Sequence, residues 1–133
     1  MTLEQRISEL SDKIQGAYES QVTIPEAEAL AAEFLHAQLL IAGELSKSDL
    51  DARMRKAGAK AIKSAVRMAE IQKHDKKPTE GALDDAMNTS GDVAEAQDAQ
   101  DAAEVRVAYL QNHLSIFREA HIFFRGVSKG KYD

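Results

Sequence analysis

From residue 103 to residue 124 the chain repeats core-type side chains at intervals that alternate between four and three residues. The set is Ala103, Val107, Leu110, Leu114, Phe117, His121 and Phe124. An average interval of 3.5 residues is typical of a helix that packs along one seam against another helix. We expect a long helix over 93–126 that packs antiparallel on the 25–75 region or against copies of itself. The predicted oligomer interface consists of Leu110, Leu114, Phe117, His121 and Phe124.

The first twenty residues predict a short docking helix. Thr2 can cap it, and Leu3, Ile7, Leu10 and Ile14 form one apolar stripe. We expect this helix to end near residue 16. A piece of this length is not stable alone, so it must dock on this chain or on a neighbouring copy.

A long helical region is predicted over 24–76. Thr23 or Ile24 precedes Pro25 at a first-turn position, and Pro78 ends the region because it disfavours helical geometry in the residue before it. Ser46 or Ser48 can cap a renewed helix. The region is therefore either one helix or a pair of helices.

The remaining segments are shorter. Residues 78–92 predict an elbow, with a short capped helical turn from Thr79 and a breaker cluster at 88–92. The last helix is expected to end at Gly126, before a flexible tail over 127–133. No stretch alternates apolar and polar residues as a strand does.

Together these segments predict one all-α domain over 1–133, an elongated antiparallel helical hairpin or bundle of two or three long helices plus short ones. Aromatic residues make up only 5% of the chain and there is no Trp. Because Ala-rich seams bury little area per residue, we expect the protein to gain stability by oligomerising.

Several classes of protein lack their signature in this sequence. There is no Cys, so the chain offers no disulfide and no thiolate ligand or nucleophile. No apolar run approaches the ~20 residues of a membrane-spanning helix, and the N-terminus lacks the pattern of a signal peptide. We expect a cytoplasmic protein without membrane association.

Catalytic and metal-binding signals are equally sparse. The pair Glu33-x-x-His36 occurs once, whereas a di-iron bundle uses two such pairs. His74, His113 and His121 have no spacing that favours a metal. Phosphate-loop, dinucleotide and serine-hydrolase motifs are missing. We therefore predict no enzymatic activity, no cofactor and no metal.

The net charge of −5 conceals alternating blocks. Residues 1–52 carry a formal charge of −7, 53–77 carry +7, 78–104 carry −8 and 105–133 carry +3. Blocks of this size either pair with one another across helices or subunits, or leave a basic face open for a partner.

The basic block contains a one-sided row of cations. Arg53, Lys56, Lys60, Lys63 and Arg67 fall within roughly 80° of arc and span about 21 Å on a helix. Such a row can follow a polyanion backbone. Met54, Ala57, Ala61, Ala65 and Met68 fall on another face, which we expect to pack.

A second basic group lies near the C-terminus. It consists of Arg125, Lys129 and Lys131, with Phe123, Phe124 and Tyr132 beside them. Aromatic side chains near cations can stack on bases. The alternative is that Phe123 and Phe124 belong to the core.

The order of these elements resembles that of the UvsY family of phage recombination mediators. The likeness covers most of the chain and consists of a short N-terminal segment, a helix that becomes basic over 51–63, a loop with acidic residues over 77–85, and a C-terminal helix. The resemblance implies a ring-forming helical subunit that binds single-stranded DNA and loads a RecA-type recombinase by displacing single-strand binding protein. It implies a location in the host cell cytoplasm for a phage-encoded protein. The family's cationic surface corresponds to the row from Arg53 to Arg67, although this chain is acidic overall.

Two hypotheses follow. The first is a non-enzymatic homo-oligomer that binds single-stranded DNA weakly, in a salt-sensitive way, through Arg53, Lys56, Lys60, Lys63 and Arg67. The second is a structural or adaptor protein, such as a phage assembly or regulatory factor, whose charge blocks set subunit register and which has no nucleic-acid role.

Overall fold

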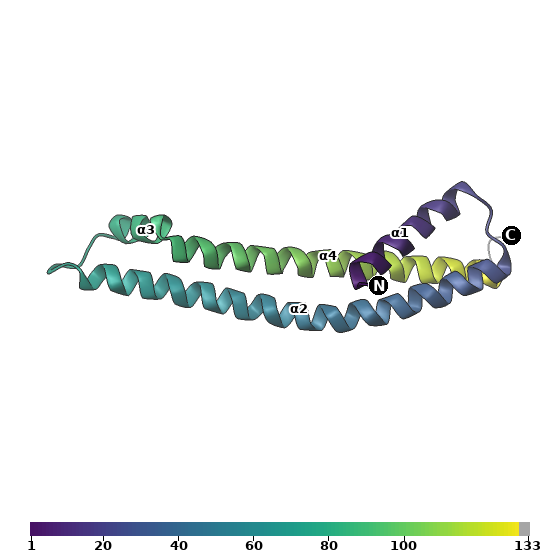
Figure 1. Ribbon diagram of the computed structural model, residues 1–133, viewed down its shortest axis with the longest axis horizontal. Coiled ribbons are helices and arrows are strands. Elements are labelled where there is room, and N and C mark those ends of the chain that lie inside the picture. The colour runs from purple at the N-terminus through teal and green to yellow at the C-terminus, as the bar shows by residue number, and fades with distance from the viewer. Residues whose placement is uncertain (131–133) are drawn as a thin grey trace. The chain divides into compact units, whose positions relative to one another are not determined.

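The computed structural model describes residues 1–130, and every regular element in this range is a helix (Figure 1). The elements are α1 (Leu3–Glu19), α2 (Ile24–Gln72), α3 (Glu80–Thr89) and α4 (Gly91–Ser128). The predicted all-α class is confirmed. None of these helices is long and apolar enough to cross a membrane.

The chain forms two compact units. Unit 1 consists of Met1–Ser46 together with the chain from Ala108 onward, and unit 2 consists of Lys47–Val107. Each unit contains one part of α2 and one part of α4.

The start of α1 is fixed by the predicted cap. The Thr2 hydroxyl oxygen accepts a hydrogen bond from the Gln5 N–H at 3.1 Å, and the Gln5 side-chain oxygen accepts one from the Thr2 N–H at 2.8 Å. This reciprocal pair satisfies two N–H groups at the helix start. The helix continues past the expected end at Gly16 to Glu19, because the Ser20 N–H and hydroxyl both donate to the Gly16 carbonyl.

The structure shows α2 as one continuous helix. Ser46 does not cap a second helix, because its hydroxyl donates to the Ala42 carbonyl at 3.2 Å within the helix. Ser48 is buried in mid-helix. The helix ends at Gln72, and the Lys73 and His74 N–H groups bond to carbonyls three residues earlier as the last turn tightens.

The elbow is more helical than expected. Thr79 caps α3 by accepting a hydrogen bond from the Ala82 N–H at 3.2 Å, as predicted. However, the predicted breaker at 88–92 does not interrupt the helices over its whole length. α3 continues through residues 88 and 89, and Ser90 alone separates it from α4. The Ser90 hydroxyl oxygen accepts a hydrogen bond from the Val93 N–H and thereby caps α4.

The predicted end of the last helix is wrong. Gly126 is buried inside α4, which continues to Ser128. The predicted flexible tail over 127–133 therefore begins within a helix, and its last three residues, 131–133, lie outside the described residues.

The core of unit 1 lies where α1, α2 and α4 meet. The Phe34 ring lies edge-on to Phe117 with 5.1 Å between centroids, and stacks on Phe124 at 5.7 Å. The Gln38 side-chain N–H donates to the Phe117 carbonyl at 3.4 Å, and His121 Nδ1 lies 2.8 Å from the Ala31 carbonyl oxygen. Residues later in α2 thus contact residues earlier in α4, so the two helices are antiparallel in this unit.

This packing corrects the predicted oligomer interface. Leu110, Phe117 and Phe124 are at most 2% exposed, and Leu114 packs against the same core. His121 bonds to α2 of its own chain. The repeat is the core seam of one chain, because α1 and α2 cover it.

Unit 2 has a thinner core. Its buried side chains are Ser48, Ala52, Ala59, Leu83 and Val93. The predicted packing face of α2 is wrong, because Met54 is 65% and Met68 54% exposed. At about 100° per residue, Ala52 and Ala59 point well away from Met54 and Met68, so α4 approaches a different side of α2 from the one expected.

Candidate nucleic-acid interface

The five cations of the predicted row all lie on α2 within unit 2. They flank the side of α2 that packs on α4, rather than pointing directly away from it, since Ala52 and Ala59 are buried. This position brings the acidic and amide side chains of α3 and α4 within reach of part of the row.

Arg67 is held by the first residue of α3. Its two terminal nitrogens donate to the two carboxylate oxygens of Glu80 at 3.0 and 2.8 Å, a bidentate pair. The hydrogen bond from Arg67 lowers the pKa of the Glu80 carboxyl, and the same bond raises the pKa of Arg67. Arg67 is therefore engaged within the chain.

Lys63 is also engaged, although by an amide. Its Nζ donates to the Gln97 side-chain oxygen on α4 at 3.0 Å, and the Gln97 side-chain nitrogen donates to Asp101 at 2.9 Å. Gln97 thus links the ammonium group to a carboxylate, and Lys63 is half-buried.

Arg53, Lys56 and Lys60 form the open part of the row. Among residues 1–130, Arg53 pairs only with Asp49, one turn earlier on its own helix, at 2.9 Å, and its side chain is 78% exposed. Lys56 and Lys60 are exposed and make no hydrogen bond or ion pair within residues 1–130. Exposed pairs along one helix are weak, so all three cations are available to a ligand.

The open part has an acidic neighbour. Arg53 and Lys56 line a small hollow of about 200 Å³ together with Asp49 and Glu104 of α4. These carboxylates moderate the positive potential, so a polyanion would bind this surface weakly.

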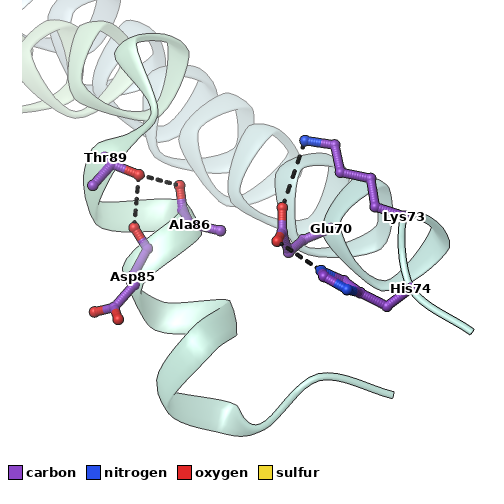
Figure 2. A network of polar contacts seen from close by, with 6 residues as sticks. All are labelled: Glu70, Lys73, His74, Asp85, Ala86 and Thr89. Carbon is purple, nitrogen blue, oxygen red and sulfur yellow. Dashed lines mark hydrogen bonds and ion pairs between the residues drawn. The ribbon is translucent and has the colours of Figure 1, made fainter. Parts of the chain in front are cut away.

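The C-terminal end of α2 carries another small polar network, shown in Figure 2. Glu70 lies 3.6 Å from the Lys73 ammonium and 3.1 Å from His74 Nε2. The hydrogen bond with His74 is the main cause that lowers the pKa of Glu70. On α3, the Thr89 hydroxyl donates to the Asp85 carbonyl at 2.8 Å. Glu70 thus partly neutralises Lys73 at the end of the basic block.

The basic group near the C-terminus does not form a stacking platform on Phe124. That ring is buried against Phe34, although Phe123 is 48% exposed and Arg125 is exposed. Lys131 and Tyr132 of the predicted group lie outside the described residues.

In the candidate metal pair, Glu33 is engaged by a cation. Glu33 accepts a hydrogen bond from Lys13 of α1 at 2.9 Å, and His36 is exposed. Across residues 1–130, no group of three or more His, Asp or Glu side chains is arranged to hold a metal ion.

Sequence reasoning did not identify the partners of Lys63 and Arg67. The acidic block over 78–104 was the available signal, but it did not indicate which carboxylates face the row. The sequence also did not indicate that Leu50, Met54 and Met68 of α2 are exposed, because an amphipathic pattern does not show which face of a helix is covered.

Comparison of the chain with protein-family models, with curated proteins and with solved structures finds no match.

Proposed function

We propose that the protein is a non-enzymatic, homo-oligomeric helical protein that binds single-stranded DNA through Arg53, Lys56 and Lys60. The observation that carries this proposal is the exposure of these three cations on one side of α2, where none of them forms an ion pair with another helix of the described chain. Lys63 and Arg67, the other two cations of the predicted row, are tethered at its end by Gln97 and Glu80.

The geometry of the open cations supports this ligand class. They span two turns of helix, about 10 Å, which matches a few consecutive phosphates rather than a single small anion. A flexible single strand can adapt its backbone to such a short row. Each chain contributes few contacts, so useful affinity requires several copies on one strand.

The resemblance to the UvsY family extends the proposal to a biological role. In that role the protein is a recombination mediator that loads a RecA-type recombinase onto DNA covered by single-strand binding protein. The open cations correspond to the part of the basic helix that carries the resemblance.

The proposal is tested by titrating a fluorescent oligo-dT strand with Lys56→Glu/Lys60→Glu. The double reversal should weaken binding at least tenfold, because it removes two phosphate contacts and adds repulsion. Helicity should be unchanged, since Lys and Glu have similar helix propensities.

The matched control is Lys47→Glu/Arg118→Glu. It changes the net charge by the same amount at exposed positions outside the row, and it should bind almost as the unmodified protein does. Equal binding by the unmodified protein and the row variant would remove the proposal, as would equal losses in both variants.

A second candidate function is a structural or adaptor role without nucleic acid. It is favoured by large apolar side chains left exposed on both units, among them Leu39 at 66%, Leu50 at 60% and Ile122 at 52%. Under this alternative, the row variant alters the native mass of the assembly and the protein has no measurable affinity for oligo-dT.

A further inference from the structure

Arg67 continues the line of the open cations along α2. Arg53, Lys60 and Arg67 follow one another at intervals of seven residues, and each interval turns the side chain by only about 20° around the helix axis. Arg67 therefore lies about 10 Å beyond Lys60 on the same edge of the helix. Lys63 lies between them along the axis, and its partner Gln97 is a neutral amide. The positive charge of the row thus extends as far as Arg67.

The carboxylate of Glu80 is what separates Arg67 from the open cations. The two terminal nitrogens of Arg67 donate to the two carboxylate oxygens of Glu80 at 3.0 and 2.8 Å. A guanidinium group makes the same pair of parallel hydrogen bonds to two oxygens of a phosphate. The Glu80 carboxylate therefore occupies the position in which a phosphate group would bind Arg67.

The first turn of α3 holds this carboxylate in place. Thr79 caps the helix, Glu80 is its first residue, and the side chain of Leu83 in the same turn is fully buried. Asp84 follows one turn after Glu80. The hydrogen bond from Arg67 to Glu80 is the main cause that raises the pKa of Arg67, and the charge of Asp84 raises it further. The start of α3 thus presents negative charge to the end of the cationic row.

The pair between Arg67 and Glu80 lies at the surface. The side chains are 35% and 65% exposed, respectively, so an approaching polyanion can reach the guanidinium group. A phosphate that binds there must displace the carboxylate. Glu80 has an advantage in this competition, because it is tethered to the same chain and its effective concentration near Arg67 is high.

We propose that Glu80 is an internal competitor of the phosphate backbone, which masks Arg67 and restricts binding by the unmodified protein to Arg53, Lys56 and Lys60. Without this carboxylate, a phosphate takes its place on Arg67, and the contact surface along α2 lengthens from about 10 Å to about 21 Å. α3 is thus an autoinhibitory element at the end of the row. The inference rests on the proposed function for the identity of the ligand, whereas the masking itself applies to any chain of phosphates.

Glu80→Gln tests the masking, because it removes the charge of the side chain and keeps its shape. The variant should bind oligo-dT roughly fivefold more tightly than the unmodified protein at low salt, since one more phosphate contact forms. The slope of log K against log salt concentration should steepen by about 0.7, the value for one phosphate contact on a single strand. Unchanged affinity and slope in this variant would overturn the proposal.

Asp85→Asn is the matched control. It removes one negative charge from the same helix at an exposed position, but Asp85 lies about 140° around α3 from Glu80. Affinity and salt dependence should stay almost as in the unmodified protein. Equal gains in the two variants would show that only the net charge matters, and would overturn the masking.

Arg67→Gln shows whether the gain passes through Arg67. In this background the added Glu80→Gln substitution should give little gain, because no masked guanidinium group is left to release. The same gain in both backgrounds would overturn the proposal.

Inorganic polyphosphate, used as a second probe, separates this inference from the proposed function. Tighter polyphosphate binding by Glu80→Gln, in a protein that has no affinity for oligo-dT, would support the masking and contradict only the proposed function. Equal binding of oligo-dT by Glu80→Gln and the unmodified protein would contradict only the masking.

Discussion

At the scale of single residues, the contacts of each cation decide whether it can bind a ligand. Arg67 and Arg53 belong to the same predicted row, yet Arg67 donates two hydrogen bonds to Glu80 of α3 while Arg53 meets only a carboxylate of its own helix. A bidentate pair between two elements has fixed geometry, whereas a pair along one exposed helix breaks at little cost. Only the second kind leaves the cation free for a phosphate.

One prediction at this scale concerns Glu80→Gln. The lowered pKa of Glu80 means that the ion pair stabilises the folded state above the ordinary Glu pKa of about 4.3, and that this contribution is lost as pH falls through the lowered value. The substitution should therefore reduce the melting temperature at neutral pH and have little effect near pH ~2. Thermal unfolding followed by circular dichroism measures both.

Glu95→Gln is the control for this experiment. It removes an exposed carboxylate of α4 that makes no ion pair within residues 1–130, so its effect on melting should be smaller at neutral pH. Identical pH profiles for the two variants would contradict the role given to the Arg67–Glu80 pair.

At the scale of the elements, local side-chain chemistry sets most helix starts. Thr2, Thr79 and Ser90 each accept a hydrogen bond from a backbone N–H three residues later, at 3.1, 3.2 and 3.3 Å. Helix ends are less local. Gly16 and Gly126 do not stop their helices, because neither adopts the left-handed conformation that ends many helices, and the only residue with positive φ among those described is Gly130.

The cap of α1 provides a prediction at this scale. Thr2→Ala removes the hydroxyl that accepts from Gln5 and should destabilise the helix start by about 1 kcal/mol. The effect should appear as faster hydrogen exchange in the first turn of α1. Ser8→Ala, at an exposed position inside the same helix, should not accelerate exchange there, and equal acceleration in both variants would contradict the capping role.

At the scale of the whole molecule, the two units have cores of different composition. Unit 1 buries Phe34, Phe117 and Phe124 together with Ile and Leu side chains, whereas unit 2 buries mainly small residues, with Leu83 and Val93 as its larger buried side chains. Because free energy from burial follows apolar area, unit 1 should be the more stable. Unit 2 also leaves the large apolar side chains of Leu50, Met54 and Met68 exposed on α2.

Native-state hydrogen exchange tests this difference. Amides over 47–107 should exchange faster than amides around Phe34 and Phe117 when the protein is dilute. Uniform protection of both units would contradict the difference in stability.

Sequence and structure contribute differently to these conclusions. The all-α class, the caps at Thr2 and Thr79 and the seam from Leu110 to Phe124 follow from local spacing and side-chain chemistry, which act within a few residues. Possible caps at Ser46 and Ser48 left open whether this region was one helix or two, and the structure has one helix there. Sequence also identified the five cations, but not which of them would be open.

What the sequence determined by itself was therefore a set of amphipathic helices with marked beginnings and a one-sided cationic row. Only the tertiary structure decided that α4 packs on Ala52 and Ala59 rather than on Met54 and Met68, and that Glu80 and Gln97 hold one end of the row. The physical reason is that helical periodicity fixes which residues share a face, whereas the face that is covered depends on contacts between segments far apart in the chain.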